Sequence, residues 1–417
     1  MTPRERVRAA IRHEQPDRVP VDLGATPSSG ISATAYARLR GALGIRDGSV
    51  RIYDVVQQLA EPEEWALERF GVDVVDLGRT FTAAAPWVDI RLPGGEAAQY
   101  PAWFAPQRQE DGSWTAVMTD GEGRAIPVGR MPAGSAFFDQ AHFPWANGWP
   151  VNLTGLDDAM ATVVWAALAH APWDSAGQPG FWQMLRSRAQ ALRRASDRAI
   201  VVVVGCNLFE WGTFLRRLDN FLMDLVLEEA RVEGLLDALL ERHLATLAKV
   251  CEAVGDVADI VRFGDDLGTD AGPFMSRDLY RRLFKPRHRA LCDYVRAHSA
   301  MATFLHSCGS VTLLLPDFVE AGFQILNPVQ TSARDMDPAR LKRDFGRDLV
   351  FWGGGVDTRA VLNRGTPAQV RDQVRERLAV FAPGGGFVFN PVHNILPDVP
   401  PENILAMFQA VAEYNGG

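Results

Sequence analysis

Short apolar runs alternate with longer amphipathic segments along most of the chain. Each run is rich in Val, Ile, Leu and Phe and is bounded by glycine or polar residues, which is typical of strands buried in a parallel sheet. Repetition of such strands between helices is the pattern of α/β proteins. The runs that we predict to be strands lie at residues 19–23, 72–77, 199–205, 258–264, 302–306, 323–327, 348–354 and 386–390.

The segments between these runs carry apolar residues at helical spacing. The first helix is predicted to begin at Pro3, because Thr2 and Glu5 form a capping box around a proline at the first helical position, and to end before Pro16. Further helices are predicted near residues 32–44, 53–71, 154–171, 179–197, 208–254, 276–298, 309–321, 337–345, 366–381 and 400–415.

The segment from about residue 85 to 150 has a different pattern. Short β-rich runs such as WVDIRL and SWTAVMTD are separated by turn glycines, which predicts hairpins and not βα units. We interpret this segment as a β-rich insertion within one domain that spans residues 1–417. Strands that alternate with helices in this number favour a single (β/α)8 barrel. A doubly wound sheet is the alternative, but no G-x-G-x-x-G follows the first predicted strand.

Composition and charge are those of a globular protein with small-molecule or protein partners. The 417 residues are 47% hydrophobic and 23% charged, and the net charge of −8 is spread without a basic stripe, which argues against nucleic acid as a partner. No apolar run is long enough to span a membrane, and the first residues lack the apolar stretch of a signal peptide. The four cysteines have no C-x-x-C spacing, so we expect a cytoplasmic protein with reduced thiols.

Nearly every predicted strand ends in a side chain that can bind a metal, accept a proton or donate a hydrogen bond. In a (β/α)8 barrel the carboxyl ends of the strands form one mouth, which holds the active site. The alternative for each residue alone is that Asp and Asn at strand ends cap the following turn. The strand-end candidates are Asp22, Asp76, Cys206, Asn207, Asp265, Asp266, His306, Cys308, Asn327, Asp357, Asn390 and His393.

His306 and Cys308 form the most specific pair. Residues two apart on an extended segment point to one side, so imidazole and thiol would project together into the mouth, and zinc takes both groups as ligands. The alternative is a buried histidine that donates to a carbonyl beside a buried thiol. A third ligand is required, and His393, the only histidine after Cys308, is the first choice. Its rivals are Cys206 and Asp266.

Two adjacent acids, Asp265 and Asp266, follow the fourth predicted strand. In a closed mouth such a pair binds a cationic or hydroxylated group or lies beside a metal, and the alternative is that one of the two caps a turn. We assign both acids a catalytic role, in orienting substrate or handling a proton. Substrate-binding roles are assigned to Asp22, Tyr53, Asp76, Asn207, Asn327 and Asn390.

Several segments together resemble the uroporphyrinogen decarboxylase superfamily. In chain order they are RERVRAAIRHEQPDRVPV, YDVVQQLAEPEE, GDDLGTDAGPFMSRDLYRRLFKPRHRAL, HSCGSVTLLLPDFVEAGFQILNPVQ, FWGGGVDT and GGGFVFNPVHNILPDVPPENI. The resemblance covers most of the chain and leaves the insertion at about 85–150 unmatched. It implies a single distorted (β/α)8 TIM barrel.

This superfamily contains porphyrinogen decarboxylases and zinc-dependent methyltransferases that work with corrinoid proteins. The decarboxylases carry arginines after the first strand that hold substrate carboxylates, whereas the corresponding stretch here, VDLGATPSSG, has none. The methyltransferases use an H-x-C pair and a later cysteine as zinc ligands. His306 and Cys308 match the pair, and His393 stands roughly in place of the later cysteine. The chain therefore resembles the methyltransferase branch more closely.

The resemblance implies a corrinoid-dependent methyltransferase with zinc as Lewis acid. It would move a methyl group between a small methoxylated substrate and a corrinoid (cobalamin) cofactor on a partner protein, in an O-demethylation. Transfer from a methylcorrinoid to tetrahydrofolate or to a thiol is one alternative. A decarboxylase of a carboxylated substrate other than a porphyrinogen is another, and a non-catalytic tetrapyrrole- or metal-binding module is the third. A homodimer is left open.

Overall fold

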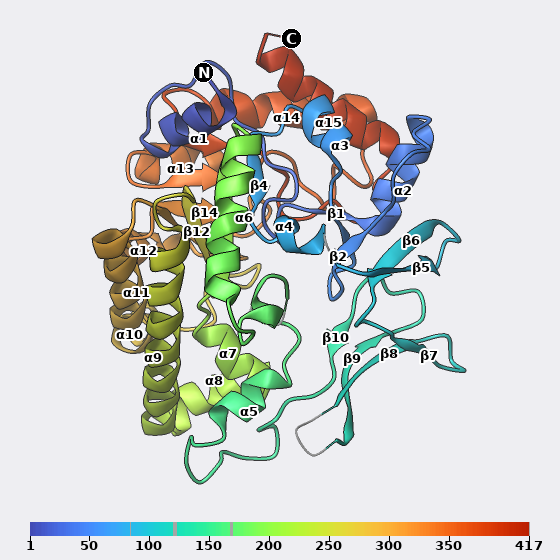
Figure 1. Cartoon of the computed structure of the whole chain (residues 1–417). Helices are drawn as coiled ribbons and strands as arrows, with labels where there is room; N and C mark the ends of the chain where they lie inside the picture. The colour runs from blue at the N-terminus through green and yellow to red at the C-terminus, as the bar shows by residue number, and fades with distance from the viewer. Residues whose placement is uncertain (84, 120–122, 167–169, 417) are drawn as a thin grey trace.

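The fold is built around a curled parallel sheet, shown in the computed structural model of Figure 1. The structure describes residues 1–83, 85–119, 123–166 and 170–416. Within these residues, parallel strands run side by side in the order β16-β15-β14-β13-β12-β11-β4. They are β4 (Val74–Asp76), β11 (Ala199–Gly205), β12 (Ile260–Gly264), β13 (Ala302–His306), β14 (Ile325–Asn327), β15 (Val350–Trp352) and β16 (Phe387–Val388).

The sheet closes on itself through a short extended segment at Val21. This residue pairs in parallel with Val72, just before β4, and with Phe389, just after β16, so it bridges the two edge strands. The seam is held by backbone hydrogen bonds from Asp22 N to Phe389 O, 2.9 Å long, and from Asp73 N to Val21 O, 2.8 Å long. The extended segments therefore surround one axis, at the positions predicted from the apolar runs. The predicted distorted (β/α)8 barrel is confirmed.

Helices cover the outside of the barrel. In Figure 1 the long helix α9 stands along one side with α6 and α11, while α14 and α15 lie at the top of the view, near both chain termini. Within the described ranges, no helix is long and apolar enough to cross a membrane. The helices are α1 (Pro3–Ile11), α2 (Ala33–Ala42), α3 (Glu64–Arg69), α4 (Arg79–Thr82), α5 (Leu156–Ala161), α6 (Phe181–Ala195), α7 (Phe209–Arg216), α8 (Leu218–Leu227), α9 (Glu229–Val254), α10 (Arg277–Leu283), α11 (Lys285–His298), α12 (Leu315–Ala321), α13 (Pro338–Phe345), α14 (Pro367–Phe381) and α15 (Pro401–Tyr414), with 3-10 turns at Trp173–Ser175 and Thr312–Leu314.

Alternate residues of each barrel strand face opposite sides, as expected of extended chain. Val201, Ile260 and Phe304 belong to a buried cluster enclosed by the barrel. Their neighbours Val261 and Leu305 belong instead to the larger cluster that the strands share with the helices. Because of this alternation, the residues at the strand ends that face the interior of the barrel lie in its mouth.

The segment predicted to be a β-rich insertion consists of antiparallel strands, which project to one side of the barrel in Figure 1. One sheet pairs β5 with β6, and a second runs in the order β10-β9-β8-β7. A further small sheet precedes them, in the order β1-β3-β2. The antiparallel strands are β1 (Ile31–Ser32), β2 (Ile52–Asp54), β3 (Leu59–Ala60), β5 (Trp87–Arg91), β6 (Ala97–Pro101), β7 (Gln107–Arg108), β8 (Trp114–Thr119), β9 (Ala125–Met131) and β10 (Asp139–Gln140).

Three predicted helices are shorter than expected, and the one near 309–321 forms only as a 3-10 turn followed by α12. The helix predicted at 53–71 forms only as α3, because residues 53–60 adopt β2, a turn and β3. The Asp54 side chain explains the turn, since its Oδ1 accepts the backbone N–H of Val56 at 3.0 Å and of Gln57 at 2.9 Å, in competition with helical bonds. The helix predicted near 154–171 forms as α5 in the described residues, and 167–169 lie outside them.

A buried carboxylate supports the seam of the barrel. Asp73 is fully buried and pairs with Arg6 Nη1 at 2.6 Å and Arg18 Nη2 at 2.9 Å. Its other oxygen accepts the backbone N–H of Val21 at 2.9 Å. Asp73 therefore joins α1, the bridging segment and the start of β4 at one point.

We expect Asp73→Ala to lower the free energy of unfolding by about 3–5 kcal/mol, because it removes the acceptor of the buried Arg6 Nη1 and of the Val21 N–H at the seam and leaves a cavity in their place. Urea denaturation of the full chain measures this change. Glu413→Ala is the control, since its pairs with Arg371 and Arg375 lie near the surface, where an ion pair contributes at most about 1 kcal/mol. A loss for Asp73→Ala no larger than that of the control would contradict the role given to Asp73.

Candidate functional site

Polar side chains meet where three neighbouring strands end. Gly264 on β12 is paired in register with His306 on β13, and His306 with Asn327 on β14. These positions form one row across the mouth of the barrel. Gly264 carries no side chain, which leaves room in the row for groups that reach in from other positions.

Asn327 fixes the orientation of the His306 ring. Asn327 Nδ2 donates to the Trp352 carbonyl at 2.8 Å, so its Oδ1 faces the opposite way. That oxygen accepts from Ser28 Oγ at 2.8 Å and from His306 Nδ1 at 2.6 Å. The ring hydrogen of His306 then resides on Nδ1, and Nε2 keeps its lone pair, the arrangement of a histidine that binds a metal. Burial lowers the pKa of His306 to about 3, which keeps the ring neutral.

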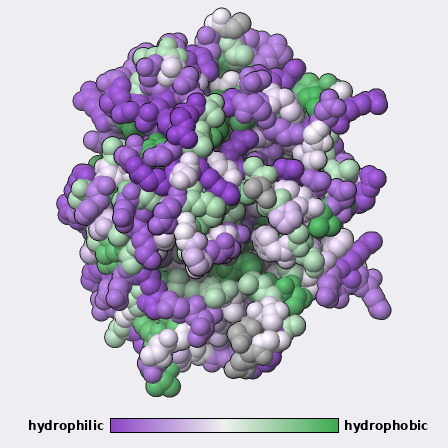
Figure 2. Space-filling view, in the orientation of Figure 1, coloured by the Kyte–Doolittle hydropathy of each residue, from purple (hydrophilic) through white to green (hydrophobic). Residues whose placement is uncertain are grey.

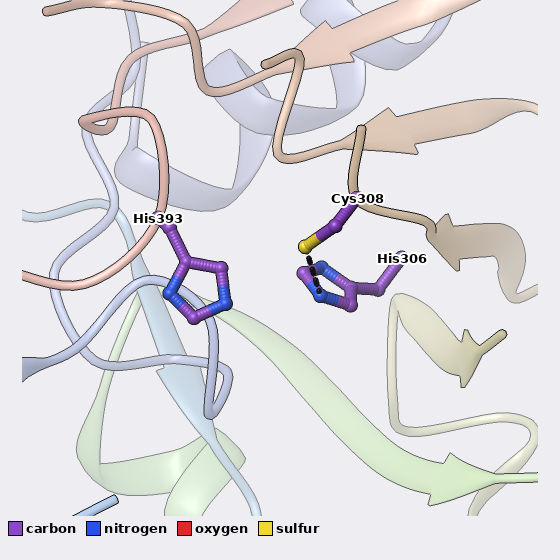
Figure 3. Close-up of side chains that lie close together, drawn as sticks. All are labelled: His306, Cys308 and His393. Carbon is purple, nitrogen blue, oxygen red and sulfur yellow. Dashed lines mark hydrogen bonds between the residues drawn. The ribbon is translucent and has the colours of Figure 1, made fainter. Parts of the chain in front are cut away.

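Cys308 and His393 stand beside the free nitrogen of His306 (Figure 3). Cys308 Sγ lies 3.4 Å from His306 Nε2, and the ring of His393 faces the pair with its centroid 5.5 Å from that of His306. One ligand atom from each residue lies within 4.8 Å of the others. His393 reaches them from the loop between β16 and α15, where its backbone φ is +83°, a value that favours glycine. Strain of this kind is typical of positions held for a function.

The three side chains fit a zinc ion. Catalytic zinc takes three protein ligands at about 2.0–2.3 Å in a tetrahedral arrangement and keeps a fourth position open, which separates the ligand atoms by about 3–4 Å. The 3.4 Å between Cys308 Sγ and His306 Nε2 meets this requirement, and a spread of 4.8 Å needs only a small shift of one ring. His306, Cys308 and His393 could therefore hold zinc and leave one position for substrate.

The structure separates the two adjacent acids that follow β12. Asp266 lies beside the ligand group, because its Oδ1 is 3.5 Å from His306 Nε2 and accepts the Cys308 N–H at 2.9 Å. Asp265 is fully buried and accepts the backbone N–H groups of residues 208–210, at 2.9 to 3.2 Å, where α7 begins. Asp265 thus caps a helix, as the capping alternative expects. Asp266 faces the mouth, where it stays an alternative third ligand.

A cavity of about 450 Å³ opens beside these groups. Its polar lining includes His306, His393 and Asp266. Phe137 and Phe138, just before β10, form part of its apolar wall, so the β-rich insertion helps to enclose the mouth. Figure 2 shows mostly hydrophilic colour on the face drawn there, with hydrophobic colour gathered in smaller patches and in a hollow of the lower half. The mouth therefore offers a partly apolar space beside the ligand group.

The other predicted substrate-binding residues fall into three places. Asn207 lines the same cavity as the ligand group. Tyr53 and Asp76 line a smaller cavity of about 60 Å³. The remaining three are fully buried, namely Asp22, Asn327 and Asn390.

Cys206, the rival third ligand at the end of β11, lies elsewhere. It is buried in the cluster that the strands share with the helices. Burial, with a smaller contribution from Cys292 and Cys251, raises the pKa of its thiol. Those two cysteines belong to α11 and α9, so the Cys206 thiol lies toward the outer helices and not toward the mouth.

The three candidate ligands lie in a region of the chain that matches a known protein family. The family model described as Uroporphyrinogen decarboxylase (URO-D) matches residues 206–414, about half of the chain. The chain belongs to the uroporphyrinogen decarboxylase family. The matched region contains His306, Cys308 and His393, and the resemblance noted from the sequence motifs is confirmed.

Curated relatives come from both branches of the uroporphyrinogen decarboxylase family. A uroporphyrinogen decarboxylase from Hahella chejuensis is 44% identical over 68 residues, which cover 16% of this chain and 18% of the relative. The methylcobamide:CoM methyltransferase MtaA from Methanosarcina barkeri is 28% identical over 182 residues, which cover 44% of this chain and 49% of the relative. The matches thus span half or less of the length of these relatives.

A solved structure shares the whole fold. It is a methyltransferase from Methanosarcina mazei, 18% identical, with a TM-score of 0.59 over 99% of both chains. At this identity the likeness establishes the barrel that positions the site, and nothing about what the site binds.

Two charged residues of this mouth are missed by the sequence analysis, Arg262 and Glu210, which both line the larger cavity. Glu210 lies in the first turn of α7 and accepts a hydrogen bond from Asn207 Nδ2. Burial, followed by the charges of Asp266 and Asp265, raises the pKa of Glu210 and favours its protonated form. The sequence holds a signal for Arg262, because a lone arginine stands in the apolar run of β12. Glu210 carries no such signal.

We expect the purified protein to bind about one zinc ion per chain, and His306→Ala, Cys308→Ser and His393→Ala each to weaken binding at least ~100-fold, because each removes one of three ligands. Asn327→Ala keeps the ligands but frees the His306 ring, so the expected loss is about 10–100-fold. Competition with a chelator of known affinity measures each constant.

Two variants serve as controls for zinc binding. His298→Ala removes an exposed histidine of α11, and Cys251→Ser alters a buried thiol of α9, so both should bind zinc as the wild type does. Zinc retained by His393→Ala but lost from Asp266→Asn or Cys206→Ser would assign the third ligand to that residue instead. A wild type that binds no zinc would exclude the metal centre.

We expect Asp76→Asn to change the pH dependence of stability. Burial raises the pKa of Asp76 from 3.8 to about 7, so the folded state holds a proton that the unfolded state releases, and the free energy of unfolding falls as pH rises between these values. Asparagine removes this fall. Because Asp76 is partly exposed in the small cavity, the variant should gain roughly 1–3 kcal/mol over the wild type at pH 8 and little at pH 4. Urea denaturation at both pH values measures the difference, and equal gains at both would contradict it.

Proposed function

We propose that the protein is a corrinoid-dependent methyltransferase, which takes a methyl group from a small methoxylated compound and delivers it to a corrinoid carried by a partner protein. The observation that carries the proposal is the group formed by His306, Cys308 and His393 beside a partly apolar cavity. A zinc site with two histidines, one cysteine thiolate and an open position is suited to activating an oxygen atom of a substrate.

The length of one match supports the methyltransferase branch, although decarboxylases are also among the relatives. The match to the methylcobamide:CoM methyltransferase of Methanosarcina barkeri extends over 182 residues, compared with 68 for the decarboxylase of Hahella chejuensis. In addition, the stretch VDLGATPSSG contributes Pro27 and Ser28 to the cavity and contains no arginine. The several carboxylates of a porphyrinogen would lack their anchors at this place.

The chemistry supplied by bound zinc is that of a Lewis acid, which draws electron density from the methoxy oxygen and makes it a better leaving group. The C–O bond would break with its electron pair on oxygen, and that oxygen would take up a proton. The electron pair of the new bond to the methyl group would come from the reduced corrinoid. Burial raises the pKa of Glu210, which lines the cavity, and so favours its protonated form; Glu210 is the proton donor that we assign. Asp266, which lies 3.5 Å from His306 Nε2, orients the substrate beside the ligand group.

Reduced cobalamin in solution replaces the partner protein in a direct test of this function. We expect zinc-loaded protein to form methylcobalamin and a demethylated product from methoxylated compounds, followed by absorbance and mass spectrometry. Cys308→Ser should lower the rate by at least ~100-fold, because a Lewis acid contributes several kcal/mol to such a reaction. His298→Ala, the control, should leave the rate within about twofold, since exposed side chains far from the site contribute little.

The products decide between the candidate functions. A methyl group found on tetrahydrofolate or on a thiol, and not on cobalamin, would change the acceptor. Carbon dioxide released from a carboxylated compound without methyl transfer would replace the proposal with a decarboxylase. Zinc-loaded protein that turns over none of these compounds would be a binding module.

A further inference from the structure

Arg262 is a buried cation without a protein partner. It is 7% exposed, forms no hydrogen bond or ion pair with any described residue, and its Nε is buried without an acceptor. The other buried arginines of the described chain are all paired, Arg6 with Asp73 and the remaining two, Arg40 and Arg216, with Glu63 and Asp224. An unpaired guanidinium in the interior is costly, so its retention at this position needs a reason.

The Arg262 guanidinium reaches the mouth of the barrel. Arg262 stands two residues before Gly264 on β12, so both face the interior of the barrel. A Cβ placed on Gly264 would lie 3.2 Å from Arg262 Nη1 and 2.7 Å from Asn207 Nδ2, which shows that these groups occupy the space over the glycine. From there Arg262 lines the same cavity as His306.

The acids around Arg262 do not neutralise it. Glu210 and Asp266 line the cavity and contribute the largest favourable charge effects on the guanidinium, yet neither forms an ion pair with it. Burial outweighs these effects and lowers the pKa of Arg262. Glu210 favours its protonated form, and a dication held by His306 would add positive charge. Asp266 supplies negative charge at this side of the cavity, but no carboxylate of the described residues is in contact with the guanidinium, whose N–H donors therefore have room for an anionic acceptor.

We propose that Arg262 binds an anionic oxygen group of the substrate, so that the methyl donor is a methoxylated carboxylate that spans the cavity from Arg262 to the metal ligands. The methoxy end of this inference rests on the proposed function, whereas the anion site rests on Arg262 itself. A guanidinium presents parallel N–H donors that match the two oxygens of a carboxylate. The apolar wall formed by Phe137, Phe138 and Phe214 suits the body of the molecule between its two ends.

Matched carboxylate and amide probes test the anion site. Methoxyacetate and 4-methoxybenzoate are titrated by calorimetry into the zinc-loaded full chain, each against its uncharged amide. We expect the wild type to bind at least one carboxylate about tenfold or more tightly than its amide, the usual effect of a charged hydrogen bond. Arg262→Gln should remove this preference, and Arg262→Lys should retain part of it, because an ammonium keeps the charge but not the paired donors. Arg296→Gln, which alters an exposed arginine of α11, should leave it unchanged.

Removal of zinc separates Arg262 from the metal as the anion-binding group. A preference that persists in the zinc-free wild type and disappears in Arg262→Gln assigns the anion to Arg262. A preference that survives in Arg262→Gln, or that neither carboxylate shows in the wild type, overturns the proposal.

Thermal unfolding separates a ligand site from a structural role. Without ligand, Arg262→Gln should unfold at the same temperature as the wild type or higher, because it removes an unpaired buried charge. A drop of several degrees would assign Arg262 to the scaffold and overturn the proposal.

The methyl-transfer assay distinguishes this inference from the proposed function. A carboxylate preference that depends on Arg262 but is accompanied by no methyl transfer would leave the anion site standing and remove the proposed function. Methyl transfer from amides as fast as from carboxylates would support the function and overturn the anion site.

Discussion

Closure of the barrel through the short segment at Val21 is the constraint on which the site depends. Because Val21 pairs with both edge strands, every strand is fixed in register around the ring, and side chains at equivalent positions must face one space. This brings Arg262, His306 and Asn327 together from three separate parts of the chain. Asn327 then sets the chemical state of His306. Its amide is anchored by the Trp352 carbonyl, and its oxygen accepts the hydrogen of His306 Nδ1, so Nε2 is the nitrogen that keeps a lone pair.

Regular backbone made most of the fold and part of the site predictable. The apolar runs coincide with the barrel segments, and the period of two along a strand was enough to place His306 and Cys308 on one side. His393 could be singled out because no other histidine follows Cys308. The first two inferences use extended segments, in which position along the chain determines the direction of a side chain, whereas His393 lies in a loop and was found by residue type alone.

The rest of the site lies where the backbone is irregular. Asp265 and Asp266 are neighbours in the loop after β12, and nothing in their order distinguishes the acid that caps α7 from the acid that faces the mouth. The helix predicted at 53–71 is also interrupted by a side chain. Asp54 accepts the backbone N–H groups of Val56 and Gln57, which favours a turn at this place instead of a helix. Arg262 lies on a regular strand, but in the middle of β12, and the charged site candidates predicted from the sequence all stand at the ends of predicted strands.

The cavity is lined by two different parts of the fold, the β-rich insertion and the barrel. Its hairpins form sheets of their own, and their end brings Phe137 and Phe138 to the mouth. His306, by contrast, ends strand β13, and Cys308 and His393 lie in segments that follow barrel strands. Mutations that lengthen, shorten or replace the hairpins can therefore reshape the wall without disturbing the strands that carry the ligands. The range of accepted molecules can therefore change without a change in the reaction, because the wall and the ligands belong to different elements of the fold.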